Sequence, residues 1–159
     1  MVTALEVPAD KLIERLAKYL KTHVKEVKPP YWASFVKTGC DREKPPEDPD
    51  WWYVRAASMM RKMYKSPEPI GVGTFRTIYG GRKNYGSSPE HFVKAGGSIP
   101  RKILQQLEKA GLVTRVPGKG RTLTPKARSI MDRIAYDIMK ELVKVNKELE
   151  KYMKSARTH

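Results

Sequence analysis

The sequence predicts a mainly α-helical protein in which the helices are arranged around one central amphipathic helix. Three observations support this class. Apolar residues recur at three- to four-residue spacing behind Asp50 and continue to Lys65. A helix, a glycine and two short strand-like runs follow one another between Ser98 and Leu123, which indicates one short β-hairpin. The length of 159 residues, with 40% hydrophobic and 31% charged residues, fits a single globular domain over 1–159.

The central helix is predicted over Asp50–Lys65. Asp50 follows a proline-rich stretch and reads as an N-cap, and Ser66-Pro67 ends the helix. The apolar stripe runs through Trp51, Val54, Ala57 or Ser58, Met59 or Met60, and Met63 or Tyr64.

The same helix carries four cations and no acid: Arg55, Arg61, Lys62 and Lys65. A core helix with solubilising charges explains the apolar positions. It explains the charged positions less well, because a merely solvated face usually mixes signs. An anionic partner is therefore favoured.

The first helix is predicted to open with Val7-Pro8-Ala9-Asp10 and to reach about His23, with an apolar side of Leu12, Ile13, Leu16, Leu20 and Val24. Tyr31–Val36 is predicted as a short helix or turn whose aromatic rings cap the core, although base stacking by Trp32 stays open. Thr38–Pro49 is predicted as an acidic, proline-containing surface loop.

After the central helix, Thr74–Tyr79 is predicted as a short helix, and Gly80–Pro89 as an irregular polar loop. Ser98 is predicted to cap a helix over 99–110, which Gly111 ends. The strands 112–116 and 121–123 flank a Pro-Gly-Lys-Gly turn. Thr124-Pro125 then begins the longest helix, predicted to reach about Tyr152, and the last residues, 155–159, should be frayed.

The stripe of the longest helix comprises Met131, Ile134, Ile138, Leu142, Val145, Leu149 and Tyr152. Packing on the first helix explains it more simply than a dimer interface does. The order of elements over about 50–125 predicts a winged-helix-like core, followed by the long C-terminal helix over about 125–152. Winged helices bind nucleic acid through a late helix and its hairpin, but some serve only as protein-contact modules.

The charge distribution favours a polyanionic partner. The formal net charge is +15, and residues 71–130 contribute +10, because Glu90 and Glu108 are their only acids. Arg82, Lys83 and Tyr85 share a glycine-rich loop, a combination that suits irregular RNA, although a solvated loop remains the alternative. The candidate RNA-binding residues are Arg55, Arg61, Lys62, Arg76, Arg82, Lys83, Tyr85, Arg101, Lys102, Lys119 and Arg121.

Several functional classes lack a signature in the sequence. Gly71-Val72-Gly73 and Gly118-Lys119-Gly120 each lack the rest of a dinucleotide or phosphate-loop fingerprint. The three histidines are scattered and Cys40 is alone, so no metal site, disulfide or cofactor is expected. No secretory signal or membrane-spanning run is recognised. We therefore expect a soluble intracellular protein that is not an enzyme.

Longer segments of the sequence resemble one family. The residues that carry the resemblance are Asp50–Ser58, Ile78–Arg82, Pro89–Phe92, Leu104–Glu108 and Gly120–Pro125. They are similar to the archaeal and eukaryotic small-subunit ribosomal protein nineteen of the "e" type, which bacteria lack. The similarity runs over nearly the whole chain, and its Arg-Ala-Ala-Ser and Tyr-Gly-Gly-Arg pieces are quite specific.

The resemblance implies a helical protein with no chemistry of its own in the head of the small ribosomal subunit. It implies binding to the 3′ major domain of the small-subunit rRNA and, from eukaryotic members, a role in pre-rRNA maturation and subunit assembly. Arg55, Arg61, Arg101 and Gly120-Arg121 fall on matching positions. Partners would be rRNA and neighbouring ribosomal proteins, on cytoplasmic ribosomes, with a monomer when free. A winged-helix DNA-binding regulator and a protein-contact scaffold remain as alternatives.

Overall fold

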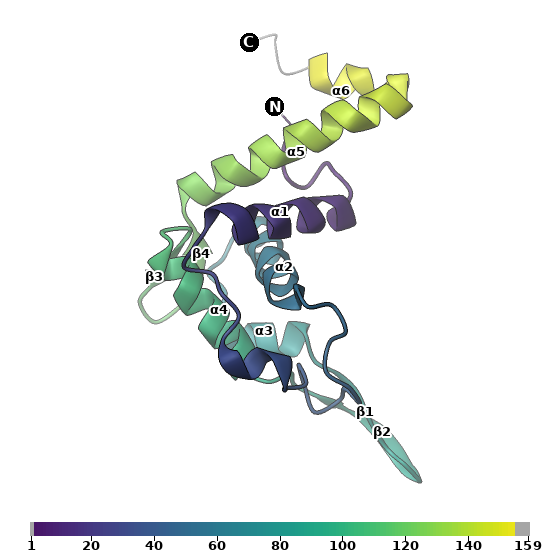
Figure 1. Cartoon of the computed structure of the whole chain (residues 1–159), viewed down its shortest axis with the longest axis vertical. Helices are drawn as coiled ribbons and strands as arrows, with labels where there is room; N and C mark the ends of the chain where they lie inside the picture. Colours follow the sequence, from purple (N-terminus) through teal and green to yellow (C-terminus); the bar gives the residue numbers. More distant parts are fainter. Residues whose placement is uncertain (1, 155–159) are drawn as a thin grey trace.

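The helix α2 (Trp51–Lys65) lies at the centre of the fold, as predicted. The computed structural model describes residues 2–154, in which α1 (Ala9–His23) packs across α2 and α5 (Pro125–Val145) packs on α1 (Figure 1). The described part is mainly helical, which confirms the predicted class. Its remaining helices are η1 (Tyr31–Ser34), α3 (Val72–Ile78), α4 (Ser98–Lys109), η2 (Lys147–Leu149) and α6 (Glu150–Lys154).

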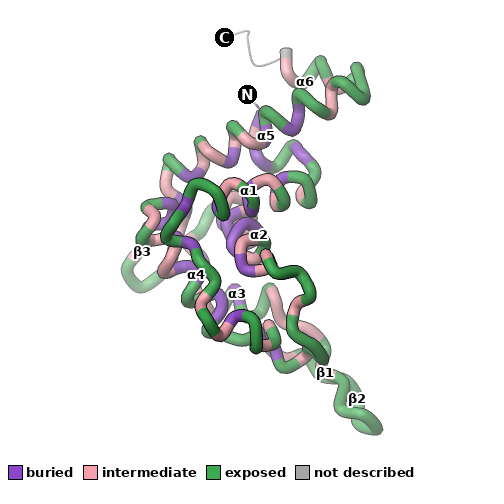
Figure 2. The backbone as a smooth tube through the Cα atoms, viewed as in Figure 1, coloured by how far each residue is buried: buried purple, intermediate pink, exposed green. Residues whose placement is uncertain are grey.

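The buried face of α2 consists of Trp52, Ala56, Ala57, Met59, Met60 and Met63. The predicted stripe is therefore correct in period but rotated at its start, because Trp52 is fully buried while Val54 is 36% exposed. Leu12, Leu16 and Leu20 of α1 join the same core. Figure 2 shows this buried core, where α1 crosses α2, flanked by exposed extremities.

The winged-helix-like core consists of α2, α3, α4 and the antiparallel pair β3 (Val113–Val116) and β4 (Gly120–Leu123), which confirms the predicted hairpin. Gly111 ends α4 with φ +71°. Its N–H donates to the Glu108 carbonyl, and the Leu112 N–H donates to the Leu107 carbonyl, both at 3.0 Å. This Schellman arrangement satisfies the last carbonyls of α4 and turns the chain directly into the wing.

The wing is attached to the rest of the domain through Ile70. The Ile70 N–H donates to the Arg121 carbonyl at 2.8 Å, and the Arg121 N–H donates back to the Ile70 carbonyl at 3.0 Å. Gly120 lies at this junction with φ +134°, and a Cβ there would come within 2.7 Å of the Ile70 carbonyl group. Gly120 is therefore required by both backbone conformation and space.

We expect Gly120→Ala to lower the free energy of unfolding by about 3 kcal/mol, because the new methyl group clashes with backbone that cannot move freely. Gly118→Ala is the matched control. Gly118 also has a positive φ, of +73°, but nothing lies within 4 Å of the position that its new methyl group would take. That variant should lose only about 1 kcal/mol. Equal losses in urea unfolding would show that the close approach to Ile70 does not matter.

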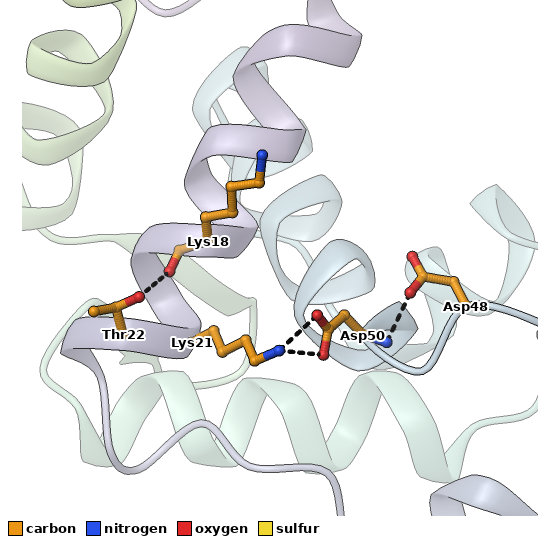
Figure 3. A network of polar contacts seen from close by, with 5 residues as sticks. All are labelled: Lys18, Lys21, Thr22, Asp48 and Asp50. Atoms are coloured by element: carbon orange, nitrogen blue, oxygen red, sulfur yellow. Dashed lines mark hydrogen bonds and ion pairs between the residues drawn. The ribbon is translucent and has the colours of Figure 1, made fainter.

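Two predicted N-caps are not formed by the expected side chains. Asp50 stands at the N-cap position of α2, but its carboxylate makes no capping hydrogen bond. Instead it pairs with the Lys21 ammonium at 2.7 Å, which ties α2 to α1 (Figure 3). Ser98 is already the first residue of α4, and Gly97 occupies the cap position. Thr124 does cap α5, since its hydroxyl accepts from the Ala127 N–H at 3.3 Å.

The prediction of an irregular loop over Gly80–Pro89 is wrong. The segment forms a second antiparallel hairpin, β1 (Gly81–Tyr85) and β2 (Ser88–Val93), which projects from the body in Figure 1. Its turn is stabilised locally: Gly86 has φ +76°, and its N–H donates to the Asn84 side chain at 2.8 Å. We refer to β1, its turn and β2 as the arm.

The longest helix ends earlier than predicted. α5 stops at Val145, because Asn146 adopts an extended conformation and its side chain accepts from the Glu148 N–H to begin η2. Met131 and Ile138 of the predicted stripe are buried, and α5 packs on α1, as expected. Val145 and Tyr152 are 88% and 57% exposed, so the stripe does not continue to its predicted end. The predicted fraying of 155–159 lies outside the described residues.

The short aromatic segment is helical, as predicted, but only one of its large rings reaches the core. Trp32 meets Trp52 edge to face, with ring centroids 5.6 Å apart. Tyr31 and Phe35 are 87% and 78% exposed. The expectation that all the aromatic rings of this segment cap the core is therefore wrong for these two.

Candidate nucleic-acid interface

Two of the predicted cations of α2 converge on one tyrosine. The Arg55 guanidinium lies 4.0 Å from the centre of the Tyr79 ring, and the Lys62 ammonium lies 5.2 Å from it. Between them, the Ser58 hydroxyl hydrogen-bonds the Tyr79 hydroxyl at 2.8 Å. Residues 55, 58 and 62 share a face because they are separated by three and four positions. We call these four residues the Tyr79 cluster.

The position of Tyr79 follows from the fold of α3. Phe75, one helical turn earlier, is fully buried, and its ring stacks on Tyr79 with centroids 6.2 Å apart. Phe75 anchors α3 in the hydrophobic core, and the Tyr79 ring that stacks on it lies beside the cations of α2. Cation–π contacts of this kind hold the two charges in place without neutralising them.

The electrostatics of the cluster are unbalanced. Burial lowers the pKa of the Arg55 guanidinium, and it also lowers the pKa of the Lys62 ammonium, which the neighbouring Arg61, Arg55 and Lys65 lower further. Within residues 2–154, neither Arg55 nor Lys62 forms an ion pair. The charge of Asp41 favours the charged form of Arg55 but does not outweigh burial, so the two half-buried cations are costly in the free protein and are stabilised when an anion arrives.

Arg61 lies on the same helix and is half-buried. Its Nε is enclosed by the protein without a hydrogen-bond acceptor among the described residues. Burial of Tyr79 raises the pKa of its phenol, so its hydroxyl stays protonated at neutral pH. The α2 side of the site therefore presents only positive and neutral donors.

Arg76 links α3 to the chain that leads into α4. Its Nε donates to the Ala95 carbonyl at 3.0 Å, and the Ala95 N–H donates to the Arg76 carbonyl at 2.9 Å. The rest of its guanidinium stays available on an exposed side chain. Arg76 can therefore hold the loop and contact an anion at the same time.

The arm presents cations and rings on both faces. Lys83 lies opposite His91 in the register of the two strands, and its ammonium lies 5.3 Å from the centre of the Tyr85 ring. Tyr85 and His91 have ring centroids 6.0 Å apart on this face. On the opposite face, Arg82 lies across from Phe92 in the strand register, and Phe92 is 54% exposed. The arm has no buried residue, as Figure 2 shows, so these side chains are free to meet a partner.

Two glycines join the arm to the body. A Cβ on Gly80 would lie 2.5 Å from the Val93 carbonyl oxygen, and one on Gly81 would lie 2.5 Å from the Asp41 carboxylate. These glycines lie between Tyr79 of the cluster and Arg82 of the arm, so the two groups meet within one four-residue segment.

The remaining predicted residues lie elsewhere. Arg101 and Lys102 are exposed on the first turn of α4, and Lys119 is exposed in the turn of the wing. Arg121 is only 19% exposed, and its Nε donates to Glu108 at 3.0 Å. Its first role is thus to fasten the wing to α4. Figure 1 separates wing and arm at different ends of the winged-helix part, so the structure does not unite all predicted residues in one patch.

Sequence reasoning gave no role in the site to Ser58 and Tyr79. Both lie in motifs that carry the family resemblance, but no local pattern joins Arg55 to a ring 24 positions later. No group of three or more His, Cys, Asp or Glu side chains suitable for a metal ion is present over residues 2–154. Within the same range, no helix is long and apolar enough to cross a membrane.

Comparison with known proteins gives a consistent result. A family model described as Ribosomal protein S19e matches residues 3–141. The small ribosomal subunit protein eS19 of Aeropyrum pernix is 67% identical over 153 residues, covering 96% of this chain and 100% of the relative. The protein of the same name from Oryza sativa is 44% identical, over 84% of this chain and 90% of the relative. The one from Mya arenaria is 43% identical, over 86% of this chain and 91% of the relative. The chain belongs to the ribosomal protein S19e family.

Proposed function

We propose that this protein is a structural, non-catalytic component of the small ribosomal subunit that binds rRNA of the subunit head, in the 3′ major domain. We further propose that it supports subunit assembly and pre-rRNA maturation on the way to cytoplasmic ribosomes. The observation that carries the RNA-binding role is the Tyr79 cluster, where Arg55 and Lys62 are held half-buried and form no ion pair among residues 2–154. A phosphate supplies the missing negative charge.

The proposed mechanism is contact at several points on folded rRNA. The Tyr79 cluster and Arg61 bind phosphates at the centre, and Arg76 and the arm residues Arg82, Lys83 and Tyr85 extend the contact outward. Arg101, Lys102 and Lys119, with the ion-paired Arg121 behind them, form a separate point on α4 and the wing. Phosphate contacts fix position and orientation, while the exposed rings of the arm can stack on splayed bases.

The proposal also includes neighbouring ribosomal proteins of the head as partners and a monomeric free state. The packing of α5 on α1 supports the monomer, because Met131 and Ile138 of the stripe that could serve a dimer are buried within the chain. A DNA-binding regulator that spans two half-sites needs such a dimer. The rRNA role is therefore preferred to the regulator.

The test is sedimentation of native extract through a sucrose gradient after a high-salt wash, with this protein followed by antibody. We expect it to migrate with small subunits. We also expect the triple variant Arg82→Ala, Lys83→Ala, Tyr85→Ala to leave the subunits at lower salt than the parent, because it loses two phosphate contacts and a stacking ring. The arm has no buried residue, so circular dichroism and Tm should not change.

The matched control replaces exposed residues of α5 and η2: Lys140→Ala, Lys147→Ala, Tyr136→Ala. It removes two cations and one ring, as the arm variant does, but from a surface outside the proposed contacts. Migration of the parent as a free small protein, or with chromosomal DNA, would refute the ribosomal role. Release of both variants at the same salt concentration would refute a specific role for the arm.

A further inference from the structure

A cleft of about 690 Å³ opens beside the Tyr79 cluster. The start of α1, the loop 38–46, the outer side of α2 and the end of α3 form its walls. Arg55, Ser58 and Tyr79 line it together with residues that have no role in the contacts proposed above. Its volume falls within the range of sites that bind small molecules.

Charge is distributed unevenly around this cleft. Arg42 and Lys44 reach it from the loop, and Arg55 reaches it from α2. Arg42 is paired with Asp41 at 3.3 Å, whereas Lys44 and Arg55 form no ion pair among residues 2–154. The α1 wall carries the carboxylates of Asp10 and Glu14. The cleft thus has a cationic side and an acidic side.

The cleft is also lined by apolar side chains, among them Pro46, Trp51 and Val54. Trp51 is only half-buried, although the adjacent Trp52 is fully enclosed, and Val54 is 36% exposed. A large ring left accessible next to unpaired cations is the combination that binds an unstacked base with its phosphate. An acidic peptide would satisfy the cations but would leave the flat apolar surface without a planar partner.

We propose that this cleft receives one nucleotide extruded from the rRNA, with its phosphate at Lys44, Arg42 and Arg55 and its base against Trp51 and Pro46. The inference rests on the proposed function, because the cleft shares Arg55 and Tyr79 with the phosphate-binding cluster. The acidic side orients the nucleotide: Asp10 repels the phosphate and accepts hydrogen bonds from an amino group on the base edge. A base with an amino group is therefore preferred to uracil.

The experiment introduces a photoreactive benzoylphenylalanine in place of Glu43, an exposed loop residue between Arg42 and Lys44 that has no part in the proposed contacts, and assembles the full-length protein into small subunits that lack it. Irradiation followed by primer extension should map one cross-linked rRNA nucleotide. Val54→Trp, introduced into the same protein, should remove that cross-link by filling the cleft. Without the photoreactive group, Val54→Trp should lower the affinity for rRNA about tenfold, which is the size of one lost stacked base.

Val145→Trp is the matched control. Val145 is the last residue of α5, is 88% exposed and does not line the cleft, so this variant should change neither result. Lys44→Glu is a second variant on an exposed loop residue that does not threaten folding, and it should weaken binding to a similar degree. Cross-linking from position 43 only to another ribosomal protein, or to nothing, in subunits at full occupancy would overturn the nucleotide site while leaving the ribosomal role intact. Failure of the unmodified protein to enter subunits would instead overturn the proposed function.

Discussion

Trp52→Ala is expected to lower the free energy of unfolding by about 4 kcal/mol, the typical effect of deleting a fully buried Trp side chain. Trp52 has no exposed surface, and its ring meets Trp32 and Trp51 edge to face at 5.6 and 5.3 Å. Its indole N–H also donates to the Gln106 side chain at 2.9 Å. The substitution therefore leaves a cavity and an unpaired polar group at the point where α2 meets α4.

Small domains of this size are stable by only about 5 to 15 kcal/mol, so this single change should bring the protein close to unfolding at physiological temperature. Chemical denaturation followed by circular dichroism measures the loss. Trp52→Phe is the control, because it keeps most of the ring and should cost clearly less. If Trp52→Ala were no worse than Trp52→Phe, the ring would not be the centre of the core.

The same residue shows where sequence periodicity stops being informative. The spacing of apolar residues predicted α2 and its ends, but it could not choose between two adjacent tryptophans. The choice is made by residues distant in sequence, since Trp32 and Gln106 contact Trp52 from η1 and α4. The Asp50 cap failed for a similar reason: Lys21 on α1 takes the carboxylate that the local pattern assigned to the backbone.

The two hairpins differ in how far the sequence could predict them. The wing has apolar residues that enter the core, Val113 and Leu123, on either side of a recognisable turn, and its strands could be predicted. The arm has no buried face, so hydrophobic alternation is absent and its polar, glycine-containing strands resemble a loop in sequence. Strand pairing through backbone hydrogen bonds alone leaves little trace in side-chain pattern.

The candidate site was predictable in its charges but not in its geometry. The absence of acids along α2 pointed correctly to Arg55 and Lys62 as cations without partners on that helix. Their contact with Tyr79 depends on how α3 packs in the core, which no local pattern around Arg55 or Lys62 specifies. Arg121 differs from these two cations. It lies in the basic segment 71–130, but it forms an ion pair with Glu108.

The second large effect is expected from Arg55→Met with Lys62→Met, which removes both charges of the Tyr79 cluster and keeps their apolar stems. Hydrogen bonds to charged groups contribute about 1.5 kcal/mol each at least, so affinity for the rRNA should fall roughly 100-fold. The slope of log affinity against log salt should decrease by about 1.4 to 1.8, as expected for two lost phosphate contacts. Filter binding across a salt series measures both.

Stability should move in the opposite direction from binding. Because burial lowers the pKa of Lys62 below its ordinary value of 10.5, the charged form is disfavoured in the folded state. That penalty is fully present below the folded pKa and disappears as pH rises past 10.5, so the parent should gain stability relative to Lys62→Met as pH approaches this value. At neutral pH the double variant Arg55→Met, Lys62→Met should be at least as stable as the parent.

Lys65→Met, at an exposed position on the same helix outside the cluster, is the control and should leave both rRNA affinity and Tm nearly unchanged. A variant that lost binding and stability together would mean that Arg55 and Lys62 serve the fold; loss of binding alone means that the fold tolerates two unpaired cations because the RNA pairs them.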